Sequence, residues 1–217
     1  METNDLEIDN LPNRLTFFRM LMIPVVVLAL YFTEDCPIWL LPYKDYLGHI
    51  ACWVFVMASI TDFLDGYIAR KRNIVTVFGS FLDPIADKFL VVSSLIMLLA
   101  INRVNSIIVI IIVLREMYMT SLRLLAMGEG VSVPVSNMGK WKTGSQMVAT
   151  PMLMVYDTTY LGYFNLPLIG MILMYVSAIL SLWSALTYSL SMIKKLREKR
   201  LHKKKIKQQN KVIKDPT

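Results

Sequence analysis

Six long apolar segments constrain the fold of this chain more than any other feature of its sequence. They are expected at roughly 15–33, 46–69, 81–101, 104–126, 143–161 and 163–193. An apolar stretch of about 20 residues is long enough for an α-helix to cross the hydrocarbon core of a bilayer. The composition agrees, since 55% of the residues are hydrophobic and the mean hydropathy is +0.51. The sequence therefore predicts an all-α integral membrane protein with six transmembrane helices.

The basic residues between these segments predict how the helices are oriented. Lys and Arg gather in the loops at 70–80 and 127–142 and in the C-terminal segment 194–217. That segment alone has eleven of them against two acids, a net charge of +9. Short cytoplasmic loops of membrane proteins are enriched in Lys and Arg. All three regions should therefore face the cytoplasm, and both termini should lie there too.

Three regions are expected along the chain. An acidic segment at 1–9 precedes a six-helix membrane domain at 10–193, and a basic cytoplasmic tail follows at 194–217. The tail is typical of a helix that lies on anionic lipid headgroups and fades into disorder. Nucleic-acid binding is a weaker explanation, because basic residues next to a membrane span already have a simpler one. No nucleic-acid partner is expected.

Four aspartates stand where the second and third apolar segments meet, within TDFLDGYIARKRNIVTVFGSFLDPIADK at 61–88. Asp62 and Asp65 are three residues apart and Asp83 and Asp87 are four apart, so each pair shares one face of a helix. Two helices joined by a short turn can bring all four carboxylates together. Such a cluster beside a membrane is costly unless a cation neutralises it. Mg²⁺ or Mn²⁺ suits these oxygen ligands, and two ions could fit; the alternative is four solvated aspartates at helix ends.

Residues 62–87 read D-x2-D-G-x2-A-R-x8-G-x3-D-x3-D, which resembles the signature of the CDP-alcohol phosphotransferases. The resemblance implies a membrane enzyme of six helices, commonly a homodimer. Such an enzyme transfers a phosphatidyl or similar group from a CDP-linked donor to an alcohol and releases CMP. The resemblance also implies that Asp62, Asp65 and Asp83 are metal ligands. Asp87 resembles the general base of the family and could share in binding the metal.

The same resemblance predicts the donor site. Gly66 and Arg70 match the positions that hold the CDP group, and Thr76 lies where a further donor contact is expected. Without the signature, Arg70 would be read as an ordinary anchor at the cytoplasmic surface.

The start of the first apolar segment, NLPNRLTFFR at 10–19, adds two candidates to this donor site. Asn13, Thr16 and Arg19 are helix-spaced and would face the same cytoplasmic mouth as the aspartates. Asn13 and Thr16 are therefore expected to contact CDP-diacylglycerol. The alternative is an amphipathic entry into the membrane with an asparagine as helix cap.

Basic residues in two further segments predict an anion site. REMYMTSLR at 115–123 puts Arg115 and Arg123 about two helical turns apart within a span, where charged residues are functional by default. GKWKTGSQ at 139–146 places Lys140 and Lys142 at a helix start, where anions bind readily. These groups suit an acceptor phosphate that is held but not transferred. The alternatives are ordinary loop lysines and an Arg123 that reaches the headgroups as an anchor.

Together with SVPVSN at 132–137, these segments resemble the bacterial branch of the family that uses glycerol 3-phosphate, over residues 10 to about 190. The resemblance implies transfer of phosphatidyl from CDP-diacylglycerol to the sn-1 hydroxyl of glycerol 3-phosphate. The enzyme would lie in a bacterial cytoplasmic membrane, among membrane lipids, with its active site facing the cytoplasm.

Three alternatives to this function stay open. The first is the same chemistry with inositol phosphate, serine or phosphatidylglycerol as acceptor. The second is a divalent-cation transporter that uses the four aspartates. Transporters, however, place such sites near the midplane and often contain repeats, whereas these acids lie at one mouth. The third is a structural scaffold, which leaves the aspartates unexplained.

Overall fold

The computed structural model describes the backbone of residues 11–72, 77–130, 137–155 and 165–214. Side chains are described for 17–61, 88–126, 128–130, 138–155 and 165–201. These parts of the chain form six α-helices and one short 3₁₀ helix: α1 (Leu11–Tyr31), η2 (Ile38–Tyr43), α2 (Lys44–Arg72), α3 (Val77–Ala100), α4 (Ser106–Gly128), α5 (Asn137–Met154) and α6 (Leu166–Lys214). Each α-helix overlaps one of the six expected segments, so the all-α prediction is confirmed.

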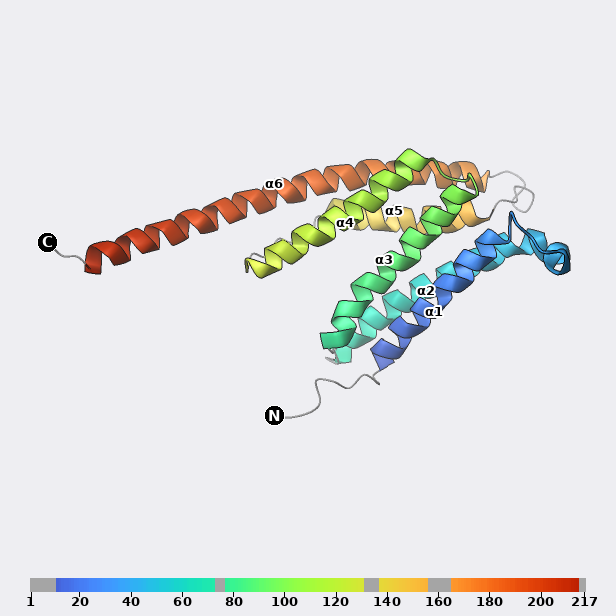
Figure 1. Ribbon diagram of the computed structural model, residues 1–217, viewed down its shortest axis with the longest axis horizontal. Helices are drawn as coiled ribbons and strands as arrows, with labels where there is room; N and C mark the ends of the chain where they lie inside the picture. Colours follow the sequence, from blue (N-terminus) through green and yellow to red (C-terminus); the bar gives the residue numbers. More distant parts are fainter. Residues whose placement is uncertain (1–10, 73–76, 131–136, 156–164, 215–217) are drawn as a thin grey trace.

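Helix α6 departs most from expectation. It is a single helix of 49 residues that continues through the basic tail to Lys214, where a helix fading into disorder was expected. Figure 1 shows it extending well beyond the other helices. No glycine or proline occurs between Gly170 and Pro216, and Lys, Arg and Gln are good helix formers. The tail therefore has the composition to propagate the helix that the apolar half begins.

The six helices run alternately up and down (Figure 1). The C-terminal ends of α2, α4 and α6 lie at one end of the bundle, together with the N-terminal ends of α3 and α5. The other ends of these helices lie at the opposite end. The basic segments that flank α2, α4 and α6 therefore share one end of the molecule, as the charge pattern predicts.

Two groups of three helices make up the bundle. In the first, α1 packs against α2 and α3, and in the second, α6 packs against α5 and α4. The groups meet mainly where α5 crosses α2, and α3 also touches α4 and α5. Aliphatic and aromatic side chains from both groups fill the centre, among them Leu30, Phe55, Leu90, Ile112 and Met174. The seam between the groups is therefore part of one continuous core.

Many large apolar side chains point outward. Trp53, Leu114 and Leu186 are each more than 60% exposed, on three different helices. Within the described residues, one helix is long and apolar enough by itself to cross a membrane, the 166–201 part of α6. Two shorter apolar stretches are found at 17–31 and 88–100. An apolar exterior of this extent indicates a surface that contacts lipid or another protein.

Helices α2 and α5 cross closely at the end of the bundle opposite the basic segments. A Cβ atom at Gly48 of α2 would lie 2.6 Å from the carbonyl oxygen of Met154, so only glycine permits this approach to α5. Arg103, between α3 and α4, donates from Nη1 to the same carbonyl at 2.6 Å and to that of Leu153 at 3.4 Å. These are carbonyls that the end of a helix leaves without a helical partner.

Replacing Gly48 by alanine should destabilise this crossing. The added methyl group would meet a backbone carbonyl, which cannot rotate away, and overpacking of this kind costs about 1–3 kcal/mol. We expect the Tm of the Gly48→Ala variant to be several degrees below that of the wild type, as measured by tryptophan fluorescence in detergent. The matched control is Gly128→Ala, because a Cβ at the exposed end of α4 would meet nothing within 4 Å. Equal Tm values for the two variants would contradict the tight crossing.

Candidate active site

A cavity of about 1200 Å³ opens between the two groups of helices. Its lining comes from α2, α3, α4, α5 and α6 and has two kinds of surface. One is apolar, formed by side chains such as Val56, Val91 and Met152. The other is basic and contains five cationic side chains: Lys88, Arg115, Arg123, Lys140 and Lys142. A site with this division can hold an apolar chain and an anionic group side by side.

All four residues predicted for the acceptor phosphate line this cavity. Arg115 and Arg123 come from α4, and Lys140 and Lys142 come from the first two turns of α5. Helix α5 begins at Asn137, six residues earlier than expected, so the two lysines belong to the helix. Arg115 and Lys142 are buried, at 8% and 3% exposure, whereas Arg123 and Lys140 are exposed. The cavity thus has an inner pair and an outer pair of cations.

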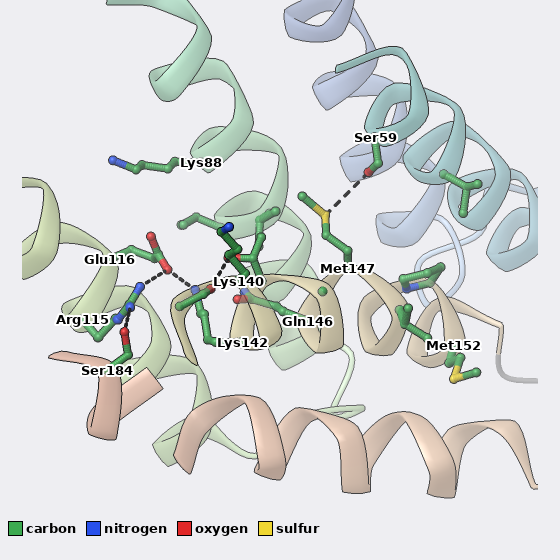
Figure 2. A pocket seen from close by; sticks show the side chains of 18 of the residues that line it. Ser59, Lys88, Arg115, Glu116, Lys140, Lys142, Gln146, Met147, Met152 and Ser184 are labelled. Atoms are coloured by element: carbon green, nitrogen blue, oxygen red, sulfur yellow. Dashed lines mark hydrogen bonds and ion pairs between the residues drawn. The ribbon is translucent and has the colours of Figure 1, made fainter. Parts of the chain in front are cut away.

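The inner pair is held by one carboxylate. The Oε1 atom of Glu116 accepts from Nη1 of Arg115 at 3.0 Å and also from Nζ of Lys142 (Figure 2). Arg115 is fixed on two further sides by α6: Nε donates to the carbonyl of Ser181 and Nη2 to Oγ of Ser184, each at 3.3 Å. Glu116 directly follows Arg115 on α4, so the ion pair between them lies within one helix. The contact of Glu116 with Lys142 joins α4 to α5.

Lys88 is the cavity residue that the sequence interpretation missed. It follows Asp87 on α3 and is not among the site residues that the sequence analysis predicts. In the structure its Nζ donates to Oγ1 of Thr120, whose hydroxyl donates to the carbonyl of Glu116 at 2.7 Å. A lysine at the start of an otherwise apolar stretch could have signalled this role. Lys88 therefore links α3 to the basic wall on α4.

The four aspartates lie in helical backbone whose side chains are outside the described residues. Asp62 and Asp65 belong to the C-terminal part of α2, and Asp83 and Asp87 to the N-terminal part of α3. Figure 1 shows these two helix ends next to each other. The cavity comes close along the chain to the first and the last of the four aspartates, since its lining includes Ile60, two residues before Asp62, and Lys88, which follows Asp87. Metal ligation and the general base stay predictions.

The predicted contacts with the CDP-linked donor also stay predictions. Asn13 and Thr16 belong to the first turns of α1, and Gly66 and Arg70 to the end of α2; their side chains are outside the described residues. Thr76 lies outside the described residues altogether. Arg19, which the helical spacing grouped with Asn13 and Thr16, is buried at 1% exposure. Its burial shows that the Arg19 side chain points into the bundle.

The chain belongs to the CDP-alcohol phosphatidyltransferase family, whose sequence pattern matches residues 9–183. The family predicted from the aspartate signature is thereby confirmed, and the basic tail lies beyond the matched region.

Bacterial relatives narrow the comparison to one branch of the family. The chain is 42% identical over 180 residues to the CDP-diacylglycerol–glycerol-3-phosphate 3-phosphatidyltransferase of Rickettsia bellii, covering 83% of this chain and 93% of the relative. It is 38% identical over 183 residues to the enzyme of the same name from Haemophilus influenzae, covering 82% and 91%. The enzyme of that name from Bacillus subtilis is 38% identical over 159 residues, covering 70% and 79%.

The five cations of the cavity predict that it binds a phosphate. Inorganic phosphate should raise the Tm of the detergent-solubilised protein, because a ligand that binds only the folded state stabilises it, by about 2.7 kcal/mol at a hundredfold excess over Kd. The Lys142→Met variant should lose most of this rise. Lys194→Met is the control, since Lys194 is exposed on the tail and does not line the cavity. The same rise in both variants would refute phosphate binding at this wall.

Proposed function

We propose that this chain transfers the phosphatidyl group of CDP-diacylglycerol to the sn-1 hydroxyl of glycerol 3-phosphate, giving phosphatidylglycerol phosphate and CMP. The observation that carries this proposal is the cavity, in which five cations from α3, α4 and α5 surround a space next to the aspartate signature. Relatives that are 38–42% identical over most of the chain and are named for this reaction support it. The reaction belongs to phospholipid biosynthesis.

The charge of the cavity favours an acceptor that carries a phosphate. Such an acceptor must be held by its phosphate while a different group reacts, and Arg and Lys are the side chains best suited to hold phosphate oxygens. Serine has no phosphate and phosphatidylglycerol carries only a diester, so neither acceptor needs five cations. Inositol phosphate would also use the basic wall. Glycerol 3-phosphate is preferred over it because of the relatives.

The four aspartates are proposed to hold a divalent metal. Asp62 and Asp65 on α2 and Asp83 and Asp87 on α3 lie on neighbouring helix ends, and their carboxylate oxygens fit the preference of Mg²⁺ or Mn²⁺ for hard ligands. Two ions would balance four carboxylates. When bound, the metal would neutralise the negative charge of the donor pyrophosphate and the charge that develops on CMP as it leaves.

The remaining groups bind and orient the two substrates. Donor contacts are assigned to Asn13, Thr16, Gly66, Arg70 and Thr76, and acceptor phosphate contacts to Arg115, Arg123, Lys140 and Lys142. Asp87 takes the proton of the sn-1 hydroxyl as that oxygen forms its bond to the β-phosphorus of the donor. The bond from that phosphorus to the oxygen of CMP breaks at the same time. Holding both substrates in one cavity supplies much of the rate enhancement.

The proposal places the enzyme in a bacterial cytoplasmic membrane. Six crossings, cytoplasmic termini and a cytoplasmic active site are supported by the apolar exterior and by the gathering of basic segments at one end (Figure 1). The membrane-embedded domain would span 10–193, with 1–9 and 194–217 outside the membrane. The exterior also suits a homodimer, and the basic helical tail suits contact with anionic lipid.

Release of CMP is the direct test of this function. Purified protein with CDP-diacylglycerol and Mg²⁺ should release CMP when glycerol 3-phosphate is added, and not with inositol phosphate, serine or phosphatidylglycerol. Asp87→Asn should lower the rate at least about 100-fold, because a general base contributes that much or more. Release with another acceptor only would overturn the assigned substrate. Metal flux through liposomes without CMP release would instead favour a transporter.

Three hydrogen bonds from the guanidinium group of Arg115 predict that lysine cannot replace this residue. A single ammonium group cannot span the carbonyl of Ser181, the carboxylate of Glu116 and the hydroxyl of Ser184 together. We expect Arg115→Lys to lower kcat/KM for glycerol 3-phosphate at least about tenfold. Arg123→Lys, an exposed position on the same helix, should change it less than about threefold. Similar losses in both variants would mean that the fixed geometry of Arg115 is unimportant.

A further inference from the structure

Glu116 is the one acidic side chain that lines the cavity in the part of the chain that the structure describes. A carboxylate beside a phosphate site weakens the attraction of its cations for an anion, because like charges repel at short range. Glu116 therefore has a role other than attracting the phosphate: it neutralises Arg115 and Lys142 so that they can be buried, and it can also bind another part of the acceptor.

The geometry of this carboxylate leaves one oxygen available. Both Arg115 and Lys142 bond to Oε1, and Oε2 takes part in no hydrogen bond among the described residues. An ionised carboxylate has about four acceptor positions, so Oε2 keeps the capacity to accept. Figure 2 shows Glu116 reaching into the space between Lys88 on one side and Lys142 on the other. Its side chain is 18% exposed, which leaves room for contact with a bound molecule.

We propose that Glu116 is a specificity-determining residue that accepts a hydrogen bond from the C2 hydroxyl of the acceptor. The inference rests on the proposed function, which makes the acceptor a glycerol phosphate. In that molecule the attacking hydroxyl is on C1 and the phosphate is on C3, so the C2 hydroxyl lies between the two groups that the enzyme must place.

Glu116 occupies the corresponding position in the protein. Its Oε1 touches two of the phosphate-binding cations, Arg115 and Lys142. On the side of α3, the backbone carbonyl of Glu116 accepts a hydrogen bond from the hydroxyl of Thr120. This hydroxyl accepts in turn from Lys88, the neighbour of the proposed base Asp87. A molecule held by its phosphate at the cations and by its C1 hydroxyl at Asp87 would carry its middle hydroxyl past this carboxylate.

A purely structural role for Glu116 makes a different prediction. If the carboxylate only neutralises Arg115 and Lys142 so that they can be buried, its removal should impair every phosphate-bearing acceptor equally. If it also binds the C2 hydroxyl, its removal should matter only for acceptors that have this hydroxyl. The two roles are therefore separated by an acceptor that lacks the C2 hydroxyl and keeps the other two groups.

The test compares glycerol 3-phosphate with 3-hydroxypropyl phosphate, which lacks only the C2 hydroxyl. In the wild type, kcat/KM should be about 10- to 100-fold higher for glycerol 3-phosphate, the range of one charge-assisted hydrogen bond. In Glu116→Ala this ratio should fall below about 3. The matched control is Ser184→Ala, which removes a bond to Arg115 and leaves Glu116 in place. It should lower both rates together and keep the wild-type ratio.

Each outcome decides between the two roles. A wild-type ratio near one, or a Glu116→Ala variant that is slower on both acceptors and keeps the wild-type ratio, would overturn the inference. If Glu116→Ala does not fold, Glu116→Gln decides. Its amide oxygen would be held by Arg115 and Lys142, so the NH2 group, which cannot accept a hydrogen bond, would take the place of Oε2. The ratio of the two kcat/KM values should therefore still fall to about a third of the wild-type ratio or less. A wild type that releases no CMP with either acceptor would defeat the proposed function itself, whatever Glu116 does.

Discussion

The shared carboxylate oxygen of Glu116 is the interaction on which the basic wall of the cavity depends. Burying a cation in a membrane protein is costly unless a charge or several hydrogen bonds compensate it. One oxygen does this for both Arg115 and Lys142, and the hydroxyl and carbonyl groups of α6 complete the shell of Arg115. Three helices are thereby tied at one point. Without that point, two buried cations would repel each other where the structure needs both.

The proposed site lies at the seam between the two helix groups. The aspartate signature is on α2 and α3, in the first group, whereas four of the five cavity cations are on α4 and α5, in the second. In the proposed reaction the donor is bound by the first group and the acceptor phosphate by the second, so the two substrates would meet across the seam. Gly48 and Arg103 hold α2 and the loop after α3 close to the end of α5. The apolar part of the cavity lining continues along α5 as far as Val155, beside this crossing.

The sequence predicts the helices and the family well because both are written in local patterns. Apolar runs of spanning length mark the helices, and the spacing of Asp62, Asp65, Asp83 and Asp87 marks the chemistry. Helix α6 is longer than predicted because the charge of the tail is typical of disorder, whereas its Lys, Arg and Gln residues favour a continuous helix. The contacts of Lys88 with Thr120 and of Glu116 with Lys142 could not be predicted, since each joins residues of different helices. Such pairs depend on how helices pack, which no local pattern specifies.

The burial of a basic residue indicates whether it only orients a membrane span or also binds an anion. Lys and Arg near a span can set its orientation, bind an anion or do both, and their sequence positions look alike. Lys140 and Lys142 show the difference, because residues two apart on a helix do not share a face. Lys140 is exposed at the edge of the cavity, whereas Lys142 is 3% exposed and paired with Glu116. Orientation requires only the charge, which an exposed lysine supplies as well as a buried one. A buried, carboxylate-paired lysine exceeds what orientation requires, and this supports the proposal that Lys142 binds the acceptor phosphate.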